Sequence, residues 1–285
     1  MIISVASGKG GTGKTTVSVS LALSLKDKAQ LIDCDVEEPN AHIFIKPIIT
    51  EEYPVCAIVP EIDSGKCKLC GKCGEICEYN AIAVMPDKPG VKGQTIVFSE
   101  LCHGCGACMY FCPKLAIKEK ERKIGLVQKG YRAGLGFIQG KLNIGEAMSP
   151  PVIREVKKRM SAETTVIIDA PPGTTCPVIA AINGSDYCVL VTEPTPFGLN
   201  DLVLATELLE KMKIPYGVVI NRSGMGDGKT MAYCQKNGIP VLMEIPFRKE
   251  IAMSYSRGRS IVEDFPEYEK SFIQMVDNIR VYVEK

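Results

Sequence analysis

Two runs of cysteines have the spacing needed for metal-binding chemistry. The chain contains 13 cysteines in 285 residues, and eight of them lie in a short segment. Shifting the sequence by 35 positions, from Cys67 to Cys102, superimposes one run of four on the other. Thiolates at such short intervals favour metal ligation in a reducing compartment, whereas disulfides are typical of secreted proteins. The eight candidate ligands are Cys67, Cys70, Cys73, Cys77, Cys102, Cys105, Cys108 and Cys112.

Each run follows the pattern C-x2-C-x2-C-x3-C and therefore resembles the bacterial ferredoxins that carry two 4Fe–4S clusters. Zinc is the alternative, but zinc sites use CxxC pairs separated by longer loops. Glu78 follows the first run where proline is usual, whereas Pro113 follows the second. In such ferredoxins the fourth cysteine of each run binds the other cluster. The resemblance implies one cluster on Cys67, Cys70, Cys73 and Cys112, and another on Cys102, Cys105, Cys108 and Cys77.

A glycine-rich segment near the start of the chain is suited to phosphate binding. Residues 8–15 fit G-x-x-x-x-G-K-[ST], directly after an apolar run at 2–6 and before a predicted helix at 15–25. Such a loop surrounds phosphate with backbone N–H groups, and the helix N-terminus faces the anion. The motif predicts an ATP site in which Lys14 contacts the β- and γ-phosphates and Thr15 binds Mg²⁺. The candidate nucleotide-binding residues here are Gly8, Lys9, Gly10, Gly11, Thr12, Gly13, Lys14, Thr15 and Thr16.

The second lysine in this loop, Lys9, resembles the deviant Walker A group, which includes MinD, ParA, the nitrogenase iron protein and the Mrp-type iron–sulfur carriers. The resemblance implies that Lys9 reaches the nucleotide of a partner subunit. It also implies that Asp35 orients the attacking water and that Asp169 is the Walker B carboxylate on Mg²⁺. Together with Lys14, these are the expected catalytic residues.

The same resemblance extends to the adenine side of the site. Asn221 and Arg222 follow an apolar run, and Pro246 lies in a segment similar to the loop that flanks the base. We expect Asn221, Arg222 and Pro246 to contact the nucleotide base. The segments that contain Asp35 and Asp169 also come at the ends of apolar runs, and ligands bind at the carboxyl ends of parallel strands.

The elements that position these residues alternate between strand and helix, which predicts an α/β P-loop fold with a parallel sheet and helices on both faces. A small ferredoxin-like α+β insert is expected to interrupt it. The predicted domains are 1–57 and 121–285 for the ATPase and 58–120 for the insert, with a loop-rich return at 125–149. Strands are predicted at 2–6, 30–33, 165–169, 187–191, 216–220 and 240–242, and helices at 15–25, 151–160, 199–211, 228–237 and 267–283.

Composition narrows the function classes. Hydrophobic residues make up 46% and charged residues 24%, with a formal net charge of +1. This is the profile of a globular protein, and it gives no global field that favours nucleic acid or an anionic membrane. No apolar run approaches 18 residues, so we expect a cytoplasmic protein.

The whole chain resembles MinD-superfamily ATPases with an inserted ferredoxin domain. This implies a homodimer with ATP sandwiched between subunits, slow ATP hydrolysis, and electron transfer through two 4Fe–4S clusters to a redox or metallocluster partner protein. Two alternatives remain open. One is an ATPase that assembles or carries iron–sulfur clusters, and the other is a MinD-like positional switch with structural clusters.

Overall fold

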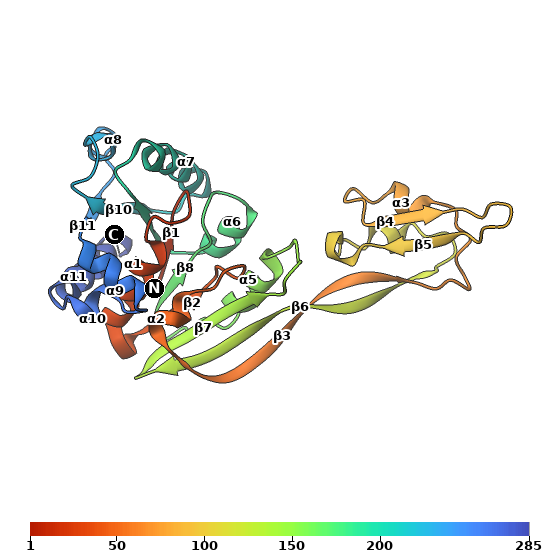
Figure 1. Ribbon diagram of the computed structural model, residues 1–285, viewed down its shortest axis with the longest axis horizontal. Helices are drawn as coiled ribbons and strands as arrows, with labels where there is room; N and C mark the ends of the chain where they lie inside the picture. Colours follow the sequence, from red (N-terminus) through yellow and green to blue (C-terminus); the bar gives the residue numbers. More distant parts are fainter. Residues whose placement is uncertain (285) are drawn as a thin grey trace. The chain divides into compact units, whose positions relative to one another are not determined.

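The computed structural model describes residues 1–284, which form two compact units (Figure 1). Unit 1 comprises Met1–Tyr53, Val127–Lys141 and the chain from Val152 onward. Unit 2 comprises Pro54–Leu126 and Leu142–Pro151. The range 58–120, predicted to be an insert, lies within unit 2.

A parallel sheet forms the centre of unit 1. The first strand pairs in parallel with a neighbour on each side, with Ile3 opposite Ile167 on one and opposite Tyr187 on the other. These strands are buried on both faces, which explains their nearly continuous apolar sequences. The whole nine-stranded sheet has the order β11-β10-β9-β1-β8-β2-β7-β6-β3, and its last three strands are β7 (Leu135–Leu142), β6 (Ile117–Arg132) and β3 (Ile48–Ile62). The strands within unit 1 are β1 (Ile2–Ala6), β2 (Ala29–Asp33), β8 (Thr165–Asp169), β9 (Tyr187–Thr192), β10 (Tyr216–Ser223) and β11 (Val241–Pro246).

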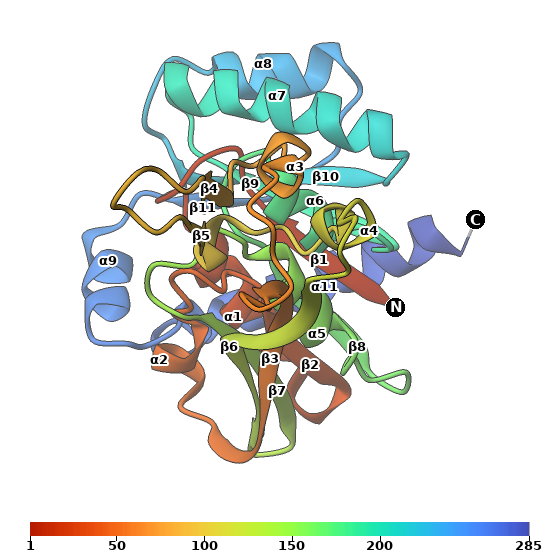
Figure 2. The ribbon, with the colours of Figure 1, turned by 90° about the vertical axis from the view of Figure 1, so that its right-hand side faces the viewer.

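Helices cover both faces of this sheet, as Figure 1 shows, so the predicted α/β fold is confirmed. Figure 2 shows α7 and α8 side by side along one face. Among residues 1–284, no helix combines the length and apolar character needed to cross a membrane. One face carries α1 (Lys14–Leu25), α2 (Ala41–Ile45), α9 (Lys249–Ser256), α10 (Ile261–Asp264) and α11 (Glu267–Val283). The other face carries α5 (Pro150–Lys157), α6 (Cys176–Ile182), α7 (Pro196–Met212) and α8 (Lys229–Lys236). A short 3-10 helix, η1 (Lys26–Lys28), follows α1.

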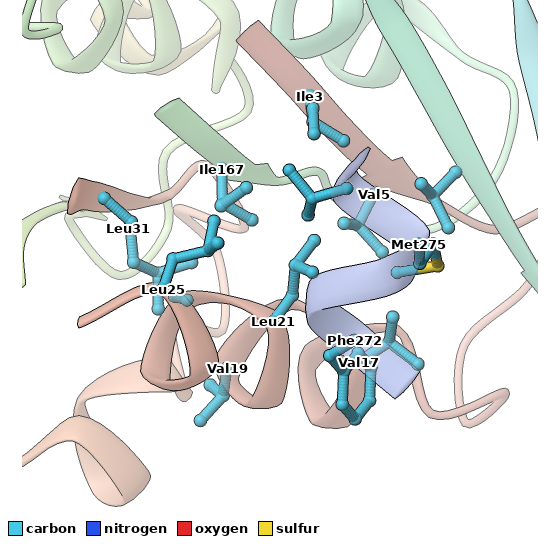
Figure 3. Packing of buried hydrophobic residues seen from close by; sticks show 14 of the residues in the cluster. Ile3, Val5, Val17, Val19, Leu21, Leu25, Leu31, Ile167, Phe272 and Met275 are labelled. Atoms are coloured by element: carbon cyan, nitrogen blue, oxygen red, sulfur yellow. The ribbon is translucent and has the colours of Figure 1, made fainter. Parts of the chain in front are cut away.

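The core on the α1 face packs the first strand against α1 and α11. Ile3 and Val5 of β1 point from the sheet toward Leu21 of α1 and Met275 of α11 (Figure 3). All four side chains are buried. Burying each one contributes roughly 1.5–3 kcal/mol. Truncating Leu21 to alanine would therefore cost about 2–5 kcal/mol and loosen the helix that follows the glycine loop.

The segment 125–149, predicted to be a loop-rich return, instead contains long strands, so that prediction is wrong. Charged residues at 118–123, the start of β6, hide the strand pattern, and the glycines within the strands allow close packing. A Cβ on Gly130 would lie 2.2 Å from the carbonyl oxygen of Ile48. A two-residue turn with positive φ at Ala133 and Gly134 joins two of the strands. The three long strands that were not predicted are β3 (Ile48–Ile62), β6 (Ile117–Arg132) and β7 (Leu135–Leu142).

The cysteine repeat of unit 2 is also a repeat in backbone conformation. Gly71 and Gly106, 35 residues apart, both have left-handed φ angles, of 83° and 74°, at the starts of short helices. Asn80 and Leu115, again 35 apart, have φ angles of 51° and 47°. Beside the ends of β3 and β6, unit 2 contains α3 (Lys72–Glu75), β4 (Ile82–Met85), β5 (Gln94–Val97), η2 (Ser99–Leu101) and α4 (Ala107–Tyr110), with β4 and β5 antiparallel.

Candidate nucleotide and thiolate sites

The glycine loop between β1 and α1 is held in a shape that only glycine permits at two positions. Gly13 precedes α1 with a φ of 94°, and a Cβ there would lie 2.2 Å from Nδ2 of Asn221. A Cβ on Gly8 would lie 2.3 Å from the carbonyl oxygen of Asp201. The Asn221 amide donates a hydrogen bond to the carbonyl of Thr12 at 2.8 Å. The contact with Asn221 therefore stabilises the conformation of the loop, in addition to the backbone angles that its own glycines permit.

Lys14 lies at the centre of a buried charge cluster. Its Nζ lies 2.8 Å from Oδ1 of Asp169 and 3.9 Å from Oδ2 of Asp35. Burial by itself disfavours the charge, but the hydrogen bond and attraction to Asp169, together with attraction to Asp35 and Asp33, raise the pKa of Lys14. Ser18 donates to the same Asp169 oxygen at 2.9 Å. Oδ2 of Asp169 is buried and has no hydrogen-bond partner among the described residues, which leaves an acceptor for a Mg²⁺ ion or its water.

Two aspartates at the carboxyl end of β2, Asp33 in its last position and Asp35 two residues later, differ in their roles. Asp33 is fully buried and accepts hydrogen bonds from the backbone N–H groups of Asp35, Asn40 and Ala41, so it fixes the segment that leads into α2. Burial and repulsion from Asp169 raise the pKa of Asp33 to about 8. Asp35 lines the cavity instead, and burial, partly opposed by Lys14, raises the pKa of its carboxyl to about 6.

A cavity of about 410 Å³ opens beside this cluster. Its size suits a nucleotide, since ligand pockets commonly occupy hundreds of cubic ångströms. Of the predicted residues, Gly8 and Thr12 lie against a different pocket, behind the loop, and Asp169 is buried behind Lys14. The predicted residues that line the cavity are Lys9, Gly10, Gly11, Gly13, Lys14, Thr15, Thr16, Asp35, Asn221, Arg222 and Pro246.

Glu193 is a site residue that the sequence reasoning missed. One carboxylate oxygen pairs with Lys9, and the other lies 2.8 Å from Nη1 of Arg222. Glu193 comes directly after β9, so its place at the carboxyl end of a parallel strand was the signal that could have revealed it. Arg248 and Tyr255 also line the cavity, and no sequence motif marked them.

The eight repeat cysteines gather around two separate cavities in unit 2. Each set of four contains three cysteines from one run and the fourth from the other. Among residues 1–284, no group of three or more His, Cys, Asp or Glu side chains converges on a single metal ion. Cavity A is lined by Cys67, Cys70, Cys73 and Cys112, and cavity B by Cys77, Cys102, Cys105 and Cys108.

Backbone N–H groups point at several of these sulfurs. The N–H of Ala81 donates to Sγ of Cys77 at 3.3 Å, and the N–H of Ala116 donates to Cys112 at the same distance. Hydrogen bonds to sulfur stabilise thiolate charge and orient ligands. A 4Fe–4S cluster takes one thiolate per iron, so four cysteines around one enclosed space are a donor set that fits such a cluster.

A parallel sheet whose first strand leads through this glycine loop into a helix defines a P-loop nucleotide-binding protein. Residues 3–261 match the CobQ/CobB/MinD/ParA nucleotide binding domain family (CbiA). The chain belongs to this family.

Three similar proteins illustrate the relationship. MJ0579 of Methanocaldococcus jannaschii is 35% identical over 274 residues, covering 92% of each chain. An iron-sulfur cluster carrier protein of Pyrococcus horikoshii is 25% identical over 303 aligned positions, covering 97% of this chain and 84% of that one. The cell division ATPase MinD of Pyrococcus furiosus has a TM-score of 0.58 with 20% identity, covering 99% of this chain and 98% of that chain, and it shares the fold.

Proposed function

We propose that this protein is an ATP-hydrolysing iron–sulfur protein, in which the nucleotide state controls electron transfer through two 4Fe–4S clusters to a partner protein. The observation that carries this proposal is that one chain holds a P-loop cavity and two four-cysteine cavities. Cysteine-bound clusters supply one-electron chemistry. Each thiolate set defined above would hold one of them.

The nucleotide site supplies the residues for phosphoryl transfer, which is mostly positioning and charge stabilisation. Lys14 would contact the β- and γ-phosphates in place of part of its present contact with Asp169. Thr15 and Asp169 would hold Mg²⁺, which neutralises phosphate charge. Asp35 would orient the attacking water. In a homodimer, Lys9 would leave Glu193 and reach the nucleotide of the second subunit.

A continuous stretch of chain offers a route for coupling. The Asp33 carboxylate holds the N–H groups of Asn40 and Ala41 at the start of α2. The strand after α2, β3, begins at Ile48 and continues into unit 2. A change at Asp35 on phosphate binding would therefore be passed along this chain toward the cysteines.

The test begins with anaerobic purification, iron and sulfide analysis and EPR. The midpoint potentials of the clusters and the rate of partner reduction are then measured with ATP and with ADP. We expect at least one of these quantities to differ between the two nucleotides. The Asp169→Asn variant should retain the clusters but lose hydrolysis by about 100-fold or more, because a Mg²⁺ ligand is changed. Absence of acid-labile sulfide, or identical potentials and rates in both nucleotide states, would refute the proposal.

A second candidate is delivery of an iron–sulfur cluster to other proteins. It is favoured by the similarity to the iron-sulfur cluster carrier protein of Pyrococcus horikoshii. Incubating the loaded protein with an apo-ferredoxin distinguishes the two functions. A carrier would lose iron and sulfide as the acceptor gains them, whereas an electron-transfer protein would retain both through repeated cycles of oxidation and reduction.

A further inference from the structure

We propose that unit 2 carries a docking surface for an acidic electron-carrier protein, beside cavity A. The docking surface comprises three exposed apolar residues, Tyr110, Phe111 and Leu115, and three lysines, Lys68, Lys72 and Lys114. The proposal rests on the proposed function in one respect, since electron exchange requires a cluster in cavity A. Binding of the carrier can be measured without that assumption.

The internal repeat provides a built-in comparison for the apolar residues. The positions 35 residues before Tyr110, Phe111 and Leu115 are occupied by Glu75, Ile76 and Asn80. Both halves form the same turns, because Asn80 and Leu115 donate their N–H groups to the carbonyls of Cys77 and Cys112. The fold of the repeat therefore tolerates polar residues at two of these positions. The second half carries large apolar side chains there instead.

These apolar side chains are not part of the core of unit 2. Tyr110 is 83% exposed, Phe111 53% and Leu115 78%. The Tyr110 and Phe111 rings pack edge to face with centroids 5.2 Å apart, so they present one aromatic surface to solvent. Exposed aromatic clusters of this kind are typical of protein–protein contacts, where tyrosine is enriched.

Leu115 gives independent support because it is strained. Its φ of 47° is left-handed, a conformation that costs a bulky residue about 1–2 kcal/mol. Asparagine tolerates it well, as Asn80 does in the first half. Since most of the Leu115 side chain is exposed, burial within this chain does not offset the strain. Burial of this side chain against another molecule would offset it.

The lysines identify the charge of that molecule. Lys68, Lys72 and Lys114 all line cavity A and are exposed. Within residues 1–284, none of the three forms an ion pair with a carboxylate. Cavity B is instead lined by one lysine and one glutamate, Lys118 and Glu119. Unpaired positive charge beside cavity A attracts a negatively charged protein and speeds its association.

Cavity A is also reachable from the surface. Cys70 is exposed, whereas the other three cysteines around this cavity are partly covered. An electron exchanged at this edge moves between the cluster and the cofactor of the docked protein, and no covalent bond is formed or broken. One side is oxidised by one electron and the other is reduced by one.

The experiment uses the full chain, purified anaerobically, with a flavodoxin as the acidic probe. Binding is measured at low and high salt, and the rate of flavin semiquinone formation is measured from the dithionite-reduced protein. Methyl viologen serves as a small acceptor that needs no docking surface. Two variants adopt the residue of the equivalent repeat position, Leu115→Asn and Lys72→Ala, and Lys123→Ala removes an exposed lysine of β6 as the matched control.

We expect Leu115→Asn and Lys72→Ala each to weaken flavodoxin binding and slow its reduction by about fivefold to tenfold. Iron and sulfide content and the methyl viologen rate should not change. Leu115→Asn should leave the Tm equal or higher, since it relieves strain. Salt should weaken binding by the unaltered protein more than by Lys72→Ala.

The proposal is overturned if both variants bind and reduce flavodoxin at the original rate, or if Lys123→Ala has an equal effect. Self-association that Leu115→Asn abolishes, without an effect on flavodoxin, would assign the surface to a second copy and also overturn it. Loss of the clusters with flavodoxin binding intact would instead refute the proposed function alone.

Discussion

Lys9 and Glu193, 184 positions apart in the sequence, form an ion pair beside the nucleotide cavity. Both side chains are less than one-third exposed, and Arg222 contacts the second oxygen of Glu193. The lysine expected to serve a partner subunit is thus held by its own chain. Formation of the ATP-bound dimer would have to break this pair.

Replacing Glu193 with glutamine should therefore promote the dimer. The amide removes the charge that holds Lys9, so the ATP-dependent dimerisation constant should rise by about threefold to tenfold. Analytical ultracentrifugation with ATP and with ADP measures this directly. Glu207→Gln, which changes an exposed carboxylate of α7, is the control, and a weaker dimer in Glu193→Gln would contradict the interpretation.

Hydrolysis should depend on the ionisation of Asp35. Burial raises the pKa of this carboxyl to about 6, so it is charged above that pH and protonated below it. Because a water-orienting carboxylate must be charged, the ATPase rate should be highest above about pH 6 and should fall roughly tenfold per pH unit below it. The rate at saturating ATP across this range is the measurement.

Two variants sharpen the pH experiment. Asp35→Asn should be slow and nearly independent of pH, whereas Glu38→Gln, at another carboxylate that lines the cavity, should keep the original profile. If Asp35→Asn kept the acidic fall in rate, another group would be responsible for it.

The glycines of the loop should differ in their tolerance of alanine. Gly13→Ala forces a side chain into left-handed backbone and against Asn221, and should cost at least about 1–2 kcal/mol with a clear drop in Tm. A Cβ on Gly10 meets no atom within 4 Å, so Gly10→Ala should unfold at nearly the original temperature. Equal Tm values for the two variants would show that the loop is not clamped in this shape.

The exchange of the fourth cysteine between runs predicts which cluster each variant loses. Cys112→Ser should disturb the cluster of the first run, and Cys77→Ser that of the second, each with a loss of up to about four of about eight irons per chain. EPR of the reduced variants distinguishes the two signals. Cys56→Ser, at an exposed cysteine outside both cavities, should keep all the iron. If both ligand variants altered the same signal, the assignment would be wrong.

Local motifs and buried strands could be predicted from the sequence. The strands at 2–6 and 165–169 have the predicted bounds, because parallel strands buried on both faces have unbroken apolar sequences. The glycine loop was equally clear, since phosphate binding requires particular residues at fixed spacing.

Features that depend on tertiary packing could not be predicted from the sequence. In β6, all six residues from Lys118 to Lys123 are charged, and only pairing with neighbouring strands makes that segment extended. The position of Glu193 directly after β9 could have indicated a site residue, but its contacts with Lys9 and Arg222, which lie far away in sequence, could not be predicted. The exposed, left-handed backbone of Leu115 is likewise visible only in three dimensions.

The division of the chain into units has a consequence for protein engineering. The polypeptide passes between units 1 and 2 at four places, after Tyr53, Leu126, Lys141 and Pro151. Cutting out the cysteine-rich segment at its two outer ends would leave Leu142–Pro151 behind, without the ion pair from Glu146 to Arg122. Separating unit 1 from unit 2 therefore requires rejoining the backbone at more than one position. A simple deletion of the cysteine-rich segment would also disturb the folding of the remaining chain, so its effects could not be attributed to the loss of the cysteines alone.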